Sequence, residues 1–299
     1  MKKCLHILLI IFVLICIPVE LFSQQKTAFA TRISQPPKID GLLTDTCWAL
    51  CDSVGDFYQY EPIYNIAASQ KTVVRIAYDD EAVYIAARMY DTAPDSILKE
   101  LGNRDDDDLN ADKFGVEFDT YNMQTDAYTF MVWASGVQLD YRKNDETYSG
   151  VWHSAVKIHD WGWACEMKIN YSALRFPKLD DQVWGLQIFR GIRRHREMDK
   201  WALEVKSSGN CLLQWGKLRG ITGVKAPLRL SITPFISLYA DHYPYNIKGQ
   251  NNFSYSFSGG LDLKYGISEC FTIDVTLLPD FSQVQSDYQV KNISAFETV

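Results

Sequence analysis

The stretch that decides the fold runs from Asp112 to Asp140 and reads DKFGVEFDTYNMQTDAYTFMVWASGVQLD. Polar and apolar residues alternate through residues 113–119. In a second run at 127–133, Tyr128, Phe130 and Val132 share one face and Ala127, Thr129, Met131 and Trp133 the other. The apolar face of the first run consists of Phe114, Val116 and Phe118. The turn-rich segment 121–126 separates the two runs. Period-two alternation on both sides of a turn is typical of a β-hairpin with one buried face. The sequence therefore predicts the central hairpin of an antiparallel sheet.

Similar aromatic-rich runs lie on both sides of this hairpin and predict further strands. They span residues 72–78, 82–90, 151–158, 163–169, 183–192, 201–205 and 215–221. Trp48 sits in a short helical turn and is expected to anchor the core, because aromatic side chains dominate buried area. Short strands with turns every 8–12 residues or so favour an all-β fold, an antiparallel β-sandwich. No helical periodicity extends beyond about two turns.

Length and composition indicate a globular, exported protein. The 299 residues are 47% hydrophobic, enough for one large or two medium cores. Residues 1–23 read as a signal peptide, with Lys2 and Lys3 before an apolar run that is too short to span a bilayer. The net charge of −7 argues against a nucleic-acid partner. We therefore expect an exported protein of the cell envelope, at the outer membrane or facing the periplasm.

Cysteines are too few and too irregular to predict a disulfide framework or a zinc site. Five remain after residue 23, without a repeated CxxC spacing: Cys47, Cys51, Cys165, Cys211 and Cys270. Cys47 and Cys51 are four residues apart, so they either pair or remain as two buried thiols beside Trp48.

An acidic run precedes the central hairpin. Its four adjacent carboxylates, together with one at the start of the hairpin, are Asp105, Asp106, Asp107, Asp108 and Asp112. Adjacent like charges either spread into water or gather around a cation. Two hypotheses follow, a solvated loop and a calcium site built from these oxygen ligands, although the spacing is not that of an EF-hand.

Several segments together resemble a known family. PPKIDGLLTDTCW, TVVRIAYDDEAVYIAARMYD, DKFGVEFDT, WACEMKI and WGKLRGI occur in the order found in family 9 carbohydrate-binding modules. This resemblance implies a jelly-roll type β-sandwich over residues 24–223 that binds a polysaccharide or oligosaccharide. The segments RDDDD, SGVQLDYR, FRGIRRHREMDKW and PDFSQVQSDYQVKNISAFET also resemble a bacterial family of unknown function. In that family such a module is fused to an outer-membrane β-barrel.

The resemblance implies a sugar site that this chain matches only in part. In sugar-binding members a tryptophan precedes the aspartate that opens the central strand, and a glutamate lies within that strand. This chain has Leu109 and Gly115 at those places, and Ser207, Ser208 and Gly209 where a second stacking tryptophan is expected.

Candidate binding residues are therefore chosen from the remaining pattern. A sugar ring stacks on an exposed aromatic side chain while its hydroxyls bond to polar groups at the rim. Alternation places Trp133 opposite the core face, and Trp161 lies in a turn before Gly162. The candidate carbohydrate-binding residues are Trp133, Trp161, Glu117 and Asp119. No GxSxG, Walker or HExxH motif occurs, and nothing pairs two carboxylates across a sugar, so no catalytic residue is assigned.

The last part of the chain, residues 224–299, alternates in longer runs. Apolar and polar residues alternate through 228–238, 253–265 and 271–277. Runs close to the 9–11 residues of a membrane strand predict the opening of an outer-membrane β-barrel, truncated at Val299 because three strands cannot close. A soluble sheet with one buried face would show the same pattern.

Three functions remain open at this point. The first is carbohydrate binding by an exported envelope protein, with a role in carbohydrate catabolism. The second is a non-catalytic scaffold or interaction domain of an outer-membrane barrel protein. The third is part of a glycoside hydrolase acting on O-glycosyl bonds, an association that comes only from the family.

Overall fold

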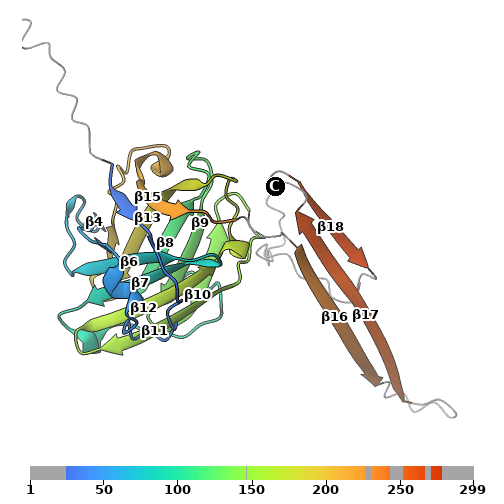
Figure 1. The fold of residues 1–299 in the computed structure, drawn as a ribbon. Coiled ribbons are helices and arrows are strands. Elements are labelled where there is room, and N and C mark those ends of the chain that lie inside the picture. The colour runs from blue at the N-terminus through green and yellow to red at the C-terminus, as the bar shows by residue number, and fades with distance from the viewer. Residues whose placement is uncertain (1–24, 146, 226–229, 243–251, 267–270, 278–299) are drawn as a thin grey trace, which may run out of the picture. The chain divides into compact units, whose positions relative to one another are not determined.

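A computed structural model describes residues 25–145, 147–225, 230–242, 252–266 and 271–277 (Figure 1). The chain divides into two compact units, residues 1–226 and 227–299. The predicted signal peptide lies outside the described residues. No helix in the described ranges is both long and apolar enough to cross a membrane.

The larger sheet of the first unit contains the predicted central hairpin. Its nine strands within the described residues are β1 (Thr27–Phe29), β4 (Tyr58–Glu61), β5 (Ile66–Ala67), β8 (Lys113–Asp119), β9 (Tyr128–Trp133), β10 (Gln138–Arg142), β13 (Asp181–Ile192), β14 (Glu197–Lys200) and β15 (Gly216–Thr222). The order is β10-β9-β8-β13-β14-β4-β5, and β15 pairs with another part of β13 and with β1. All pairs are antiparallel except β1 with β15.

The smaller sheet is built on the two hairpins predicted at 72–90 and 151–169. Its six strands in the described part of the chain are β2 (Thr31–Arg32), β3 (Ser53–Val54), β6 (Thr72–Tyr78), β7 (Ala82–Tyr90), β11 (Trp152–His159) and β12 (Gly162–Asn170). Among the residues that the structure describes, helical structure is limited to α2 (Cys47–Leu50) and the 3-10 turns η1 (Pro94–Ser96), η2 (Tyr171–Ala173), η3 (Arg193–His195) and η4 (Cys211–Gln214). The short helical turn expected around Trp48 is therefore confirmed.

The two sheets enclose one apolar core between their facing sides. Phe114, Val116 and Phe118 are fully buried there, as the alternation predicted, and they meet Ile76 and Ile85 of the smaller sheet. Aromatic rings fill the middle of this core; the ring centroids of Phe118 and Trp184, for example, lie 5.7 Å apart. The predicted antiparallel β-sandwich is confirmed.

The segment before β3 covers one end of the outer face of the smaller sheet. Trp48 packs there against Tyr84 and Ala86, and its Nε1 donates to Glu166 Oε1 at 2.9 Å. The other oxygen of Glu166 accepts the backbone N–H groups of Asp40 and Gly41. Because a buried carboxylate is stable only when its hydrogen bonds are made, Glu166 fixes this segment to the sheet.

Cysteine pairing is absent within the described residues, where four thiols are free, among them Cys47 and Cys51. The pairing alternative for these two is therefore wrong. Burial raises the pKa of the Cys47 thiol to about 11, and the Cys51 Sγ donates to the Cys47 carbonyl. Cys270 lies outside the described residues.

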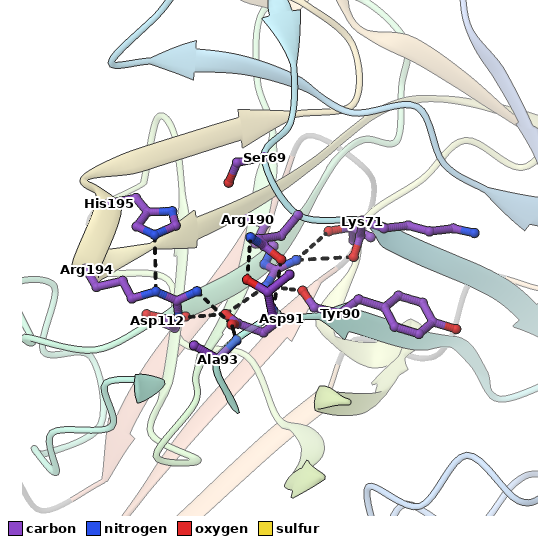
Figure 2. A network of polar contacts seen from close by, with 12 residues as sticks. Ser69, Lys71, Tyr90, Asp91, Ala93, Asp112, Arg190, Arg194 and His195 are labelled. Carbon is purple, nitrogen blue, oxygen red and sulfur yellow. Dashed lines mark hydrogen bonds and ion pairs between the residues drawn. The ribbon is translucent and has the colours of Figure 1, made fainter. Parts of the chain in front are cut away.

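One buried arginine joins the two sheets at an end of the sandwich (Figure 2). Arg190 of β13 points into the interior and is fully buried. Its guanidinium donates to the carbonyl of Tyr90 at 2.9 Å and to Thr72 Oγ1 at 3.2 Å. A carboxylate oxygen of Asp91 lies 3.9 Å from the Arg190 guanidinium. The same carboxylate accepts two hydrogen bonds from Arg194, at 2.7 and 2.8 Å. The sheets are thus tied by charged hydrogen bonds as well as by apolar packing.

The strand predicted at residues 201–205 is wrong. The strand in this region, β14, lies earlier, because Glu197 and Asp199 face inward toward Arg190 and pair with the end of β13. Trp201 donates its backbone N–H to Ile188 O, after which the chain leaves the sheet. The sequence did not predict β14, because a run of charged residues is typical of a solvated turn and does not show that two of its carboxylates face inward.

The second unit contains the three runs predicted after residue 227. They form the strands β16 (Leu230–His242), β17 (Phe253–Gly266) and β18 (Thr272–Leu277), in the order β16-β17-β18 and antiparallel throughout. The register places Leu238 opposite Phe257 and Ile232 opposite Leu263, so apolar residues share one face. Phe257 is 73% exposed and Leu238 79%.

Candidate functional site

The outer face of the larger sheet carries a line of polar side chains from four neighbouring strands. Tyr141 of β10 pairs with Thr129 of β9, Thr129 with Glu117 of β8, and Glu117 with Gln187 of β13. These four residues, called the polar row below, lie side by side at the strand spacing of about 4.8 Å. All four project away from the core, since Phe118 and Phe130 face inward on the same strands.

Hydrogen bonds hold the polar row in place. Thr129 Oγ1 donates to Glu117 Oε1 at 3.1 Å. Gln187 Nε2 donates to Glu204 Oε1 at 2.8 Å, and Trp215 Nε1 donates to the same oxygen at 2.9 Å. The row therefore holds a hydroxyl, a carboxyl and an amide at fixed positions. Thr129 and Gln187 are buried, so Glu117 and Tyr141 are the members that a ligand can reach.

The charge of Glu117 depends on pH near neutrality. Burial disfavours its charged form and raises its pKa to about 7, opposed by the nearby Lys200. Tyr141 at the end of the row has a ring that is 47% exposed, and burial of its hydroxyl together with the charge of Glu117 raises its pKa. At pH 7 Glu117 thus exchanges between hydrogen-bond donor and acceptor.

An apolar patch borders the polar row on the same face. Phe189, Met131 and Leu139 pack together there with Trp133. The ring of Phe189 lies over Gly115: a Cβ atom built on that glycine would be 2.3 Å from Phe189 Cζ. The aromatic ring thus fills the space that a side chain at position 115 would need.

A groove of about 260 Å³ opens beside this patch. Leu109 and Trp133 contribute its apolar lining, and acidic and basic side chains form its rim. The charged residues of the rim are Glu61, Asp107, Asp108, Lys113, Arg193, Arg196 and Glu197. A hollow of about 550 Å³ lies elsewhere, lined by residues 32–36, 45–47 and 50, none of which is aromatic. The groove beside Trp133 is therefore the better match to a sugar site.

The exposure predicted for Trp133 is wrong. Its side chain is only 2% exposed, its Nε1 donates to the Asp106 carbonyl, and the ammonium of Lys113 lies 5.1 Å from its ring centroid. Alternation correctly put Trp133 outside the main core, but the loop before β8 covers that side as well. A sugar could stack on this ring only after Lys113 moved.

Trp161 lies on the other sheet, in the turn between β11 and β12. Its ring is half-buried and stacks on His159, with centroids 4.6 Å apart. The guanidinium of Arg88 lies 5.0 Å from the same ring, and Tyr90 contacts it as well. Trp161 therefore belongs to a surface separate from the polar row.

Glu117 and Asp119 share a strand face, as predicted, but differ in role. Asp119 is buried and accepts the backbone N–H groups of Met123 and Gln124, which fixes the turn after β8. Its carboxylate is thus engaged in local structure. Glu117 is the one of the two that belongs to the polar row.

The five carboxylates of the calcium hypothesis stand apart. Asp105 accepts from the Asp140 N–H, Asp106 accepts from the Asn103 N–H, and Asp107 and Asp108 are exposed at the groove. Asp112 is buried and accepts from the Arg193 N–H; burial raises its pKa. No group of three metal-ligating side chains is gathered anywhere in the described part of the chain. The residues therefore do not form the oxygen cage that calcium requires.

Sequence reasoning missed Tyr141 and Gln187. Neither has a local signature, because each becomes part of the site only through strand pairing. The usable signal was the segment 138–142, which continues the central hairpin and brings Tyr141 beside Thr129. The contact between Lys200 and Tyr60 was also missed. The Lys200 ammonium lies 4.3 Å from the centroid of the Tyr60 ring and covers one face of it.

Comparison with known families and structures agrees with this architecture. Residues 39–191 match the family model described as carbohydrate family 9 binding domain-like, and residues 226–299 match a domain of unknown function, DUF5916. None of the curated proteins is significantly similar to the chain.

Solved structures share the sandwich. A candidate carbohydrate-binding protein from Bacteroides uniformis has a TM-score of 0.54 at 11% identity, covering 66% of this chain and 100% of that one. A family 9 module from Caldicellulosiruptor kristjanssonii in complex with cellotriose has a TM-score of 0.47 at 15% identity, covering 66% and 96%. The same module in complex with glucose has 0.48 at 14%, covering 68% and 100%.

Proposed function

Because the chain belongs to the carbohydrate family 9 binding domain-like family, we propose that its sandwich, residues 24–223, binds a neutral glycan without catalysing a reaction. The binding surface is the outer face of the larger sheet. The observation that carries this proposal is the exposed Tyr141 at the end of the polar row, on the same face as the carboxyl of Glu117, which buried Thr129 holds in place. An open ring near a fixed carboxyl offers a pyranose both stacking and a hydrogen-bond partner.

The position of the site differs from the one that the family pattern implies. Leu109 replaces the first stacking tryptophan in the groove, and Phe189 occupies the space above Gly115. On the same face, lysines cover the rings of Trp133 and Tyr60. Tyr141 remains open, so the proposal places the sugar over β10, β9 and β8.

The rival function is a scaffold or interaction domain that binds no sugar. Two observations support this rival: the chain lacks the two stacking tryptophans of sugar-binding members, and the ring of Trp133 is covered. A part in O-glycosyl hydrolysis is less favoured, because Asp119 is engaged in its turn and leaves Glu117 without a second free carboxylate nearby on its strand.

Affinity electrophoresis of the full chain in gels containing xylan, hydroxyethyl cellulose or a soluble glucan tests the proposal. We expect retardation in at least one neutral glycan and its loss in Tyr141→Ala. Tyr255→Ala, a change of the same kind at a 74% exposed tyrosine of the second unit, is the matched control and should keep it. No retardation of the folded wild-type chain in any of these gels would favour the scaffold.

The proposed place of action is the cell envelope. Residues 1–23 would direct export, and residues 224–299 would form part of an outer-membrane β-barrel that holds the module at the membrane. The exposed apolar face of β16, β17 and β18 supports this, since lipid-facing residues alternate with polar ones in such strands. A role in carbohydrate catabolism would follow from glycan capture at that location. Fractionation of cells that express the full-length gene decides it: the product should appear in the outer membrane, and recovery from the soluble periplasm would refute it.

A further inference from the structure

The outer face of the smaller sheet is covered at one end only. The segment held by Trp48 and Glu166 reaches the backbone of Lys157 and the ring of His159 through Gly41, and a partly exposed basic and aromatic strip lies beside it. We define the basic strip as Lys71, Arg75, Arg88, Tyr90, Lys157, His159 and Trp161. The register places all of its strand residues outward, because their neighbours Val74, Ile85, Met89 and Cys165 lie in the core.

The members of the strip form one continuous surface around Trp161. Its ring contacts His159, Arg88 and Tyr90, and the Lys71 ammonium lies 5.8 Å from the Tyr90 ring centroid. Figure 2 shows the side chains of Lys71 and Tyr90 extending side by side, away from the buried network of Arg190.

The cations of the strip lack close ion-pair partners, although the charge of Lys157 acts on Asp40 and helps to lower its pKa. None of Lys71, Arg75, Arg88 and Lys157 forms an ion pair with any described residue. The Nε atoms of Arg75 and Arg88 are buried and have no hydrogen-bond partner in the described part of the chain. An unpaired guanidinium favours an anionic ligand, because charge-assisted hydrogen bonds are stronger than neutral ones.

The spacing of the cations suits a chain of sugar rings. Arg88 and Lys157 both pair with Ala164, from the strands on either side of it. The two cations are therefore two strand spacings apart, or about 10 Å. Trp161 and Tyr90 lie beside the line between them, and their rings hold Arg88 and Lys71 through cation–π contacts. A lipid surface is less suitable, since none of the exposed aliphatic side chains belongs to the strip.

We propose that the basic strip is a second glycan site, which binds an acidic polysaccharide through carboxylate or sulfate groups. It goes beyond the neutral-glycan function above and does not depend on it, because the two sites are on opposite sheets. The cations bind the acidic groups, and the aromatic rings contact the sugar.

Affinity electrophoresis of the full chain tests this proposal with charged and uncharged probes. Dextran sulfate and dextran share a backbone and differ in charge, and polygalacturonate supplies carboxylates. We expect retardation by one or both acidic probes, weakening as salt is raised, and none by dextran. The double variant Arg88→Gln, Lys157→Gln should bind about tenfold more weakly, since two charge-assisted contacts are lost.

Two controls separate this site from the polar row and from general charge effects. Lys168→Gln removes a cation at the covered end of the same sheet, where it pairs with Glu81 at 3.2 Å, and should leave binding unchanged. Tyr141→Ala should leave acidic probes bound while it abolishes retardation by the neutral glycans. The proposal is overturned if neither acidic probe retards the wild-type chain, if the double variant binds like wild type, or if duplex DNA competes as well as polygalacturonate.

Discussion

The two units of this protein share one sequence pattern and use it in opposite ways. In the sandwich, Phe114 and Phe118 alternate with Lys113, Glu117 and Asp119 and are fully buried; in the three-stranded sheet, Leu238 and Phe257 alternate with serines and are largely exposed. Alternation thus determines which residues share a face, but it does not determine what covers that face. The four predictions that follow test this difference, beginning with the largest expected effect.

Removing a buried ring should matter far more than removing an exposed one. Phe130→Ala should lower the free energy of unfolding by about 3–5 kcal/mol, because it leaves a cavity in the core. Phe257→Ala should change it by less than about 0.5 kcal/mol in water. All eight tryptophans lie between residues 48 and 215, so urea denaturation followed by tryptophan fluorescence reports on the sandwich. Equal effects of the two variants would contradict the comparison.

Loss of the arginine between the sheets should have the next largest effect. Arg190→Ala should destabilise the sandwich by about 2–3 kcal/mol, since the carbonyl of Tyr90 and the hydroxyl of Thr72 lose a buried donor. Asp91 keeps its two hydrogen bonds to Arg194, which limits the loss. Arg193→Ala, at an exposed neighbour, is the control for the same denaturation experiment. A loss below about 0.5 kcal/mol for Arg190→Ala would show that apolar packing alone joins the sheets.

The sandwich should also lose stability as pH rises through neutrality. Glu117 has a raised pKa of about 7, so the folded state holds a proton that the unfolded state has already released above its ordinary pKa. The stability that this proton gives the folded state is fully present below the ordinary pKa of a glutamate and is lost by about pH 8. The loss is on the order of 1–2 kcal/mol. Asp199 behaves in the same way, with a pKa raised to about 8. Glu117→Gln should flatten the decrease between pH 5 and 8, and Asp199→Asn should flatten its upper part. If denaturation midpoints of wild type and Glu117→Gln fall in parallel, Glu117 is not the titrating group.

The smallest effect is expected on the polar side of the three-stranded sheet. Lys264 and Asp274 are both exposed and lie 3.7 Å apart on neighbouring strands. An exposed ion pair contributes little, so Lys264→Ala should change stability by less than about 0.5 kcal/mol. Thermal unfolding followed by far-ultraviolet circular dichroism checks this value. A larger loss would mean that the polar face is packed against something.

Strand positions in the sandwich could be predicted wherever alternation was clean. Residues 72–78 and 82–90 form strands with the predicted bounds, because turns at Asp79–Glu81 leave one hairpin register. The prediction failed at residues 201–205, because the strand lies at Glu197–Lys200 and two of its acids face inward beside Arg190. The arginine is close to them only through strand pairing, which leaves no local signal.

The candidate site was predictable only in part. Glu117 was identified because it stands on the central strand, opposite the core face. Trp133 was misjudged because a single strand cannot show that the loop carrying Asp106 returns over it. Tyr141 and Gln187 required the order of the strands in the sheet, which depends on pairing across long stretches of chain.

The ring of Phe189 over Gly115 also limits the mutational routes open to this surface. A glutamate introduced at position 115 would meet the tip of that ring, so it requires Phe189 to move or to become smaller. The two positions are therefore epistatic: a side chain at 115 should be tolerated better together with a small residue at 189. Directed evolution toward the family's usual sugar contacts would therefore have to begin on β13, one strand away from the residue it aims to restore.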